Sequence, residues 1–103
     1  MIRGTTPDLI LTVDADLTGQ TVFVTLSQAG VKTTISGDDL SIEAGETSVI
    51  ALRLTQEQTL GMRSGTASVQ VRMIDENGIA RATEIRSVNI APVLWEKVIS
   101  YGG

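Results

Sequence analysis

The stretch that decides the fold is TVFVTLSQ at residues 21–28, followed by AG at 29–30 and VKTTI at 31–35. Aliphatic side chains stand at every second position from Val22 to Leu26, and Phe23 and hydroxyl residues stand between them. This period of two is typical of a β-strand with one buried face. Because Ala29-Gly30 is a turn signal, residues 31–35 are expected to return as the antiparallel partner. The sequence therefore predicts a β-hairpin with an aliphatic inner face.

The same period recurs along the whole chain, and turns rich in glycine and acidic residues separate its segments. Further strands are expected at residues 8–14, 40–43, 48–54, 66–74 and 79–90. The apolar phase changes within the last of these, which predicts a β-bulge near residues 84–86. About seven short antiparallel strands at roughly 8–12-residue spacing are typical of an all-β, immunoglobulin-like β-sandwich.

Two local motifs refine this prediction. Thr55 and Gln58 have the spacing of a capping box, in which each side chain bonds the backbone of the other residue. One short helical turn near residues 55–60 is therefore expected, ending at Gly61. Asn77-Gly78 is a strong hairpin signal, because both residues tolerate a positive φ angle.

The 103 residues fit a single domain, 1–103, with an N-terminal arm at 1–7 and a C-terminal tail at 93–103. Hydrophobic residues make up 42% of the chain and aromatic residues only 3%, so the core must be aliphatic. There is no cysteine to form a disulfide and no histidine to serve as the base of a catalytic triad. No motif surrounds either lysine, and we predict that the protein is not an enzyme and needs no cofactor.

The charge and hydropathy of the chain indicate that neither nucleic acid nor a membrane is a partner. The net charge of −4 disfavours nucleic acid, because the surface repels phosphates. No apolar run approaches the roughly 20 residues of a membrane span, and residues 1–7 lack the apolar core of a secretion signal. Synthesis in a cytoplasm, without membrane attachment, is expected.

Acidic residues gather in the predicted turns. Asp and Asn are common in turns because their side chains hydrogen-bond the nearby backbone. Asp14 and Asp16 could meet Asp38 and Asp39 at one end of a sandwich and offer oxygens to calcium. A module that binds a glycan or calcium through its acidic turns is therefore the alternative to a module that binds proteins. No loop has a full calcium-ligand spacing, and the few aromatic rings offer little for sugar stacking.

The two ends of the chain hold the candidate partner-binding residues. The tail carries Trp95 and Tyr101, two of the three aromatic residues, and such side chains are favoured anchors at interfaces. The other interpretation of the tail is a final strand or short helix that caps the core. The arm carries Ile2 and Arg3 before Gly4, which suits strand addition to a neighbour as well as a frayed terminus.

Several parts of the chain resemble a group of small phage and prophage proteins. They are the leader MIRGTTP at 1–7, Ser27-Gln28, LTQEQT at 54–59, VQVR at 69–72, Asn77-Gly78, Ala80 and RSV at 86–88. More distantly, the chain is similar to the immunoglobulin-like N-terminal module of phage upper baseplate proteins, which attaches a receptor-binding apparatus to the tail. The resemblance implies a virion part made in the host cytoplasm and brings no catalytic residues. A baseplate, tail or head adaptor or a decoration module is expected, in contact with other phage structural proteins, and a homo-oligomer is compatible with this role.

Overall fold

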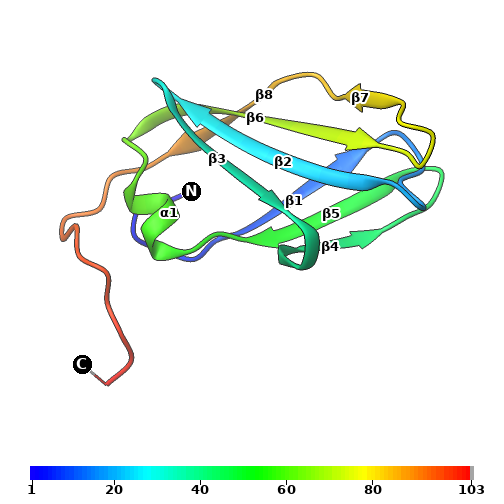
Figure 1. Cartoon of the computed structure of the whole chain (residues 1–103). Coiled ribbons are helices and arrows are strands. Elements are labelled where there is room, and N and C mark those ends of the chain that lie inside the picture. Colours follow the sequence, from blue (N-terminus) through cyan, green and yellow to red (C-terminus); the bar gives the residue numbers. More distant parts are fainter. Residues whose placement is uncertain (103) are drawn as a thin grey trace.

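The computed structural model describes residues 1–102, which form two antiparallel β-sheets facing each other in a sandwich-like arrangement (Figure 1). The strands are β1 (Asp8–Val13), β2 (Thr21–Gln28), β3 (Val31–Ser36), β4 (Leu40–Glu43), β5 (Ser48–Arg53), β6 (Gly65–Ile74), β7 (Ala80–Ala82) and β8 (Arg86–Ile90). A 3-10 turn, η1 (Gly37–Asp39), precedes β4, and the helix α1 (Gln56–Leu60) follows β5. The predicted all-β class is confirmed.

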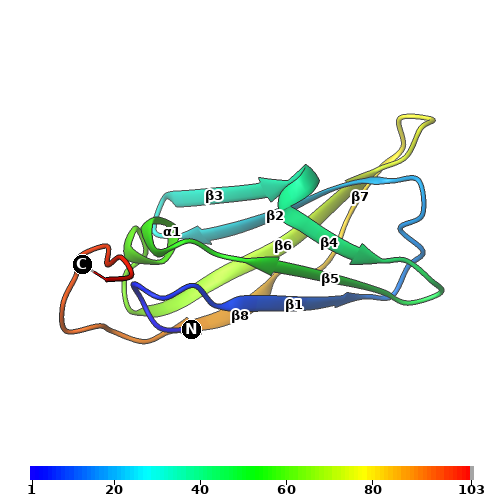
Figure 2. The ribbon, with the colours of Figure 1, turned by 90° about the horizontal axis from the view of Figure 1, so that it is seen from below.

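The strands divide between a three-stranded and a five-stranded sheet. The smaller sheet has the order β1-β5-β4, and the larger has the order β3-β2-β6-β7, with β8 also paired to β6. Figure 2 shows both layers and places the N-terminus, α1 and the C-terminus at the same end of the molecule. That end is where the candidate partner-binding residues of the arm and the tail lie.

The β2–β3 hairpin is as predicted. Gln28 pairs with Val31, so that only Ala29 and Gly30 form the loop. Both have positive φ angles, 47° and 87°, which is the backbone of a type I′ turn. Alanine adopts this conformation at a steric cost that glycine avoids.

The core is aliphatic, as the composition required. Inward side chains at alternate positions of β1, β2, β5 and β6 form one cluster with Ile90, Met62 and Leu17. The inner face predicted for Val22 to Leu26 is confirmed, the same period of two holds in β1, β5 and β6, and residues from both sheets contribute to the cluster. Close packing of such side chains is the main source of stability in a domain without disulfides.

The predicted single strand at 79–90 is wrong in one respect, because it divides into β7 and β8. Arg72 pairs with Ala82, whereas Val69 pairs with Arg86, so one extra residue stands on the β7–β8 side. Thr83 occupies this bulge: its amide donates to the Val71 carbonyl at 2.9 Å, and its hydroxyl accepts from the Val71 amide at 3.1 Å. The expected bulge therefore ends one strand and starts another, which gives eight strands rather than about seven.

The two local motifs are both present. The capping box of α1 forms, since the Thr55 hydroxyl accepts from the Gln58 amide and the Gln58 side chain accepts from the Thr55 amide. The Asn77-Gly78 hairpin also forms, but within it only Gly78 has a positive φ angle. Asp75 stabilises this turn, because its carboxylate accepts from the amides of Asn77 and Ile79.

Ser48 ties the β1–β2 connection to the small sheet, and its removal should be costly. Its side chain is fully buried, donates to the Ala15 carbonyl at 2.7 Å and accepts from the Leu17 amide at 3.1 Å. Ser48→Ala leaves both groups without this partner, so we expect a loss of about 2 kcal/mol in the free energy of unfolding. Urea denaturation measures it, with exposed Ser41→Ala as the control. Equal stability of the two variants would contradict this role.

Candidate protein-docking site

The C-terminal segment, residues 93–102, leaves the sheets after β8 and passes beside α1 (Figure 1). Pro92 precedes it, and it contains neither a strand nor a helix. It is thus neither of the two elements considered as a cap for the core. Gly103, the last residue of the predicted tail, lies outside the described residues.

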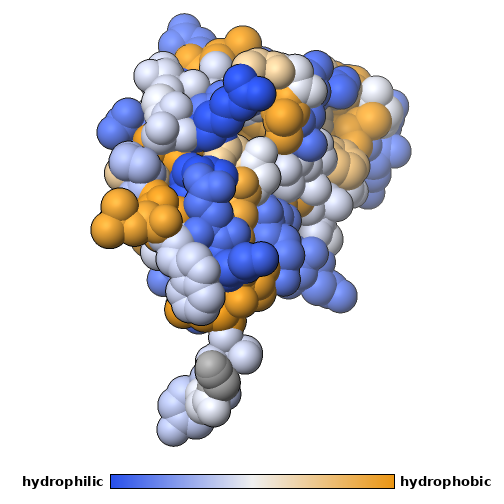
Figure 3. Space-filling model, turned by 90° about the vertical axis from the view of Figure 1, so that its left-hand side faces the viewer, coloured by the Kyte–Doolittle hydropathy of each residue, from blue (hydrophilic) through white to orange (hydrophobic). Residues whose placement is uncertain are grey.

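The segment exposes large side chains to an unusual degree. Leu94 and Tyr101 have relative exposures of 105% and 108%, so almost nothing shields them. Trp95, Val98 and Ile99 are also more than half exposed. Figure 3 shows apolar patches on this end of the molecule and the chain end projecting from the body. Grouped exposure of this kind is typical of an interaction surface, whereas scattered single residues are ordinary.

The body of the protein holds this segment at two points. The Gln56 side chain donates to the Ile99 carbonyl at 2.8 Å and accepts from the Ile99 amide at 2.7 Å. The side-chain amide of Gln56 therefore bonds both backbone groups of Ile99, as the backbone of a neighbouring strand would. At the second point, Arg3 forms an ion pair with Glu96, with an N–O distance of 2.5 Å. The exposed side chains are thus presented by an anchored backbone.

Arg3 acts within its own chain in this arrangement. Its side chain is only 16% exposed, and one Nη atom donates to the Leu60 carbonyl at 2.9 Å while the other contacts Glu96. Its buried Nε has no hydrogen-bond partner among the described residues. The predicted candidate Arg3 therefore lies under the candidate surface and supports Glu96, because the fold brings the arm and the C-terminal segment together.

The N-terminal arm is paired in place. Ile2 forms a parallel bridge with Ala91, and the Arg3 amide donates to the Ala91 carbonyl at 3.0 Å. The Thr59 hydroxyl adds a bond to the Thr5 carbonyl. The arm therefore already occupies a sheet edge of its own chain. The Ile2 side chain remains half exposed and is available to a partner at the same end.

Two residues of this site were missed from the sequence. Gln56 lies within the predicted helical turn but was given no role, and its contact with Ile99 joins positions 43 residues apart. Glu96 was not singled out, although a charge directly after the apolar pair Leu94-Trp95 is the one local signal of an anchor. The structure also adds Leu94, Val98 and Ile99 to Trp95 and Tyr101 as exposed side chains.

The acidic turns do not converge, contrary to the expectation. Val13 pairs with Ser48 at one end of the small sheet, and Leu40 pairs with Leu52 toward the other. Asp14 and Asp16 therefore lie at the opposite end from Asp38 and Asp39. Within residues 1–102, no group of three or more acidic side chains is placed to hold a metal ion.

Two aspartates have a lowered carboxyl pKa, and in each case a neighbouring side chain donates the hydrogen bond responsible. Hydrogen bonds from the Thr18 hydroxyl and amide lower the pKa of the Asp16 carboxyl below its usual value. A hydrogen bond from Arg53, together with its charge, lowers the pKa of Asp8. Both carboxyl groups lie on the surface, so their lowered pKa values come from a turn hydrogen bond and a surface ion pair.

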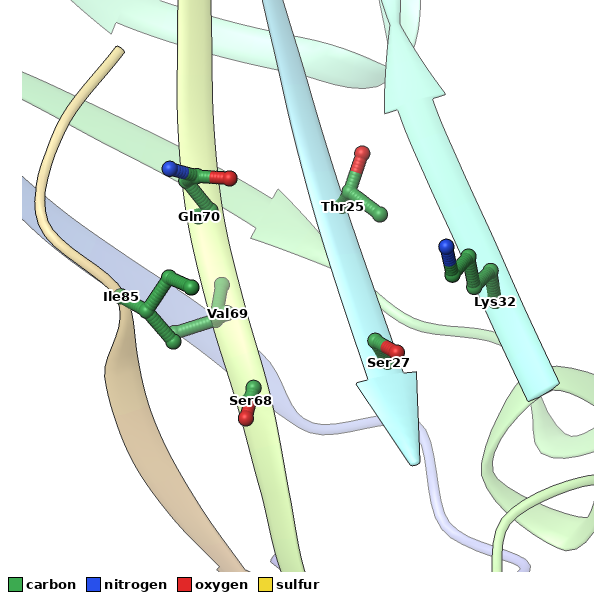
Figure 4. A pocket seen from close by; sticks show the side chains of 7 residues that line it. All are labelled: Thr25, Ser27, Lys32, Ser68, Val69, Gln70 and Ile85. Carbon is green, nitrogen blue, oxygen red and sulfur yellow. The ribbon is translucent and has the colours of Figure 1, made fainter. Parts of the chain in front are cut away.

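A shallow groove of about 280 Å³ lies on the outer face of the large sheet (Figure 4). Lys32 on β3 and Ile85 stand on its two sides, with Thr25, Ser27, Ser68, Val69 and Gln70 between them. Among the described residues, the Lys32 ammonium makes no hydrogen bond to Ser27 or Ser68.

None of the helices within residues 1–102 is long and apolar enough to cross a membrane. Comparison of the sequence with protein-family models and with curated proteins found no match to either.

Proposed function

We propose that this protein is a structural or accessory subunit of a phage virion and that it works by protein–protein contact through the C-terminal segment. The observation that carries the contact is a run of exposed apolar and aromatic side chains on a backbone anchored by Gln56 and Arg3. Anchoring matters because an already ordered segment loses less conformational entropy when a partner binds it. The assignment to a virion rests on the sequence resemblance described above.

The strand order supports an immunoglobulin-like assignment for the module. If β1 is taken as the second strand of that fold, β1-β5-β4 has the order B-E-D and β3-β2-β6-β8 has the order C′-C-F-G. Residues 1–3, which pair beside β8, then take the place of the first strand. The module would serve as a rigid spacer that presents its docking end.

Repetition strengthens such contacts. Copies arranged on a symmetric particle bind through several weak contacts at once, which raises their avidity by orders of magnitude. A baseplate, tail or head adaptor and a decoration subunit all meet this description. The subunit is made in the host cytoplasm and then resides in the virion. No observation favours the alternative, a glycan- or calcium-binding module, since the acidic turns lie at opposite ends of the small sheet and no group of three carboxylates within residues 1–102 is placed to hold a metal ion.

Purified phage particles test this proposal. Particles from a host that encodes this chain are separated on a density gradient, and the chain is quantified by mass spectrometry. We expect the full chain to co-purify with the particles and a chain truncated after Pro92 to be lost from them. Circular dichroism of the truncated chain verifies that β-structure is retained. Particles that lack the full chain, or that incorporate both forms equally, would refute the proposal.

A further inference from the structure

The proposed function gives no role to Asn77-Gly78, the motif at the tip of the β6–β7 hairpin. The chain has two asparagines, Asn77 and Asn89, and only Asn77 precedes a glycine. Residues 76–78 are all exposed to water. Because glycine has no side chain, nothing of Gly78 itself shields its backbone nitrogen from the side chain of Asn77.

An asparagine in this position can lose its side-chain amide without an enzyme. The Gly78 backbone nitrogen, after its proton passes to hydroxide, attacks the side-chain carbonyl carbon of Asn77. A carbon–nitrogen bond forms and closes a five-membered succinimide, while the bond to the side-chain nitrogen breaks. That nitrogen takes a proton from water and leaves as ammonia. Water then opens the ring at either carbonyl, which gives aspartate or isoaspartate at position 77.

The fold holds this reaction back, because the turn engages the nitrogen that must attack. The Gly78 amide donates to the Asp75 carbonyl at 3.1 Å. The Asp75 carboxylate accepts from the amides of Asn77 at 2.9 Å and Ile79 at 3.0 Å. The attacking amide thus keeps its proton in a hydrogen bond, and the backbone on both sides of Asn77 is held in one turn conformation.

We propose that Asn77 is the site of spontaneous deamidation in this chain and that Asp75 suppresses the reaction while the β6–β7 turn is closed. Reaction requires the turn to open, so its rate follows the fraction of molecules in which the turn is open. Asn89 is a much slower site, since it precedes the β-branched Ile90 within β8. The inference is independent of the virion role, because it concerns the hairpin alone.

The two products differ in their effect on the hairpin. Aspartate at position 77 keeps the length of the main chain and adds a negative charge beside Asp75 and Glu76. Isoaspartate directs the main chain through the former side-chain carbon, which lengthens the turn by one methylene group. The pairing of Ile74 with Ala80 then no longer fits the turn, and β7, an edge strand of three residues, is loosened from β6.

Peptide mapping by mass spectrometry tests the proposal, since conversion of the amide to an acid changes the mass of one peptide. The full chain is incubated at mildly alkaline pH, folded or unfolded in guanidinium chloride, and conversion at Asn77 and Asn89 is followed over time. Asp75→Ala removes the carboxylate from the turn. Glu76→Ala is the matched control, because it also removes one exposed negative charge beside Asn77 but takes no part in these hydrogen bonds.

Asn77 should convert at least about tenfold faster in the unfolded chain than in the folded one, since only the open turn reacts. Folded Asp75→Ala should convert at least about threefold faster than the native chain, because lost hydrogen bonds raise the open fraction. Glu76→Ala should keep the native rate. Circular dichroism verifies that both variants retain β-structure.

Equal rates at Asn77 in the folded and unfolded chain would overturn the inference, whatever the variants do. Conversion at Asn89 as fast as at Asn77 in the unfolded chain would overturn the assignment of the site. A rate for Asp75→Ala no higher than that for Glu76→Ala would overturn the protective role of Asp75.

Discussion

Leu26→Ala should lower the free energy of unfolding by about 3 kcal/mol, within the range found for leucine-to-alanine changes in packed cores. Leu26 has no exposed surface and lies on β2, between Thr33 of β3 and Val69 of β6. Truncation removes apolar contacts and leaves a cavity that the neighbouring strands cannot close. Few aromatic rings are present in this chain to fill the space. Urea denaturation at constant m-value measures the loss.

Ile10→Ala is the matched control for this prediction. Ile10 is also a β-strand aliphatic residue, but it points outward from β1 and is 65% exposed. Its removal should change the free energy of unfolding by no more than about 0.5 kcal/mol, as surface substitutions usually do. Equal losses in the two variants would mean that the inner and outer faces of the strands have been assigned wrongly.

The double substitution Trp95→Ala with Tyr101→Ala should weaken binding to particles by about 100-fold or more. Two interface anchors contribute at least about 2.7 kcal/mol together when each is a modest hot spot, and each 1.4 kcal/mol is tenfold in Kd. Both side chains are mostly exposed in the free protein, so the melting temperature should stay unchanged. The measurement is titration of the labelled chain onto particles assembled without it.

Exposed apolar residues elsewhere provide the control for this second prediction. Ile79→Ala and Ile85→Ala remove exposed apolar side chains at the β6–β7 turn and beside the bulge. These variants should bind with unchanged affinity. If they weaken binding as much as the aromatic pair does, the contact surface lies on the large sheet and not on the C-terminal segment.

The sequence predicted the strands well where one buried face imposed a period of two. The inner residues of β2, β5 and β6 and the two-residue hairpin followed from local pattern and turn chemistry alone. The division of residues 79–90 into β7 and β8 was harder to predict. It depends on hydrogen bonds between Thr83 and Val71 of β6, which is distant in the sequence. A change of apolar phase revealed the bulge but not that pairing would restart beyond it.

The sequence indicated which residues of the candidate site are exposed aromatic side chains, but not how the fold brings the arm, α1 and the C-terminal segment together. Trp95 and Tyr101 were singled out because aromatic residues are rare in this chain, and both proved to be exposed. Arg3 was also singled out, yet its side chain lies against α1 and Glu96, a contact that only the folded chain creates. The acidic turns could not be placed without the β1–β5 and β4–β5 registers, which put them at opposite ends of the small sheet.

Hydrogen exchange of the chain, free and bound to particles, tests the docking role of the C-terminal segment most directly. In the free chain, exchange should be fast along residues 93–102 except at the Ile99 amide, which Gln56 protects. On binding, our account predicts new protection across this segment and no change at the acidic turns. Protection at Asp14, Asp16, Asp38 and Asp39 with none at residues 93–102 would contradict it and favour recognition through the acidic turns.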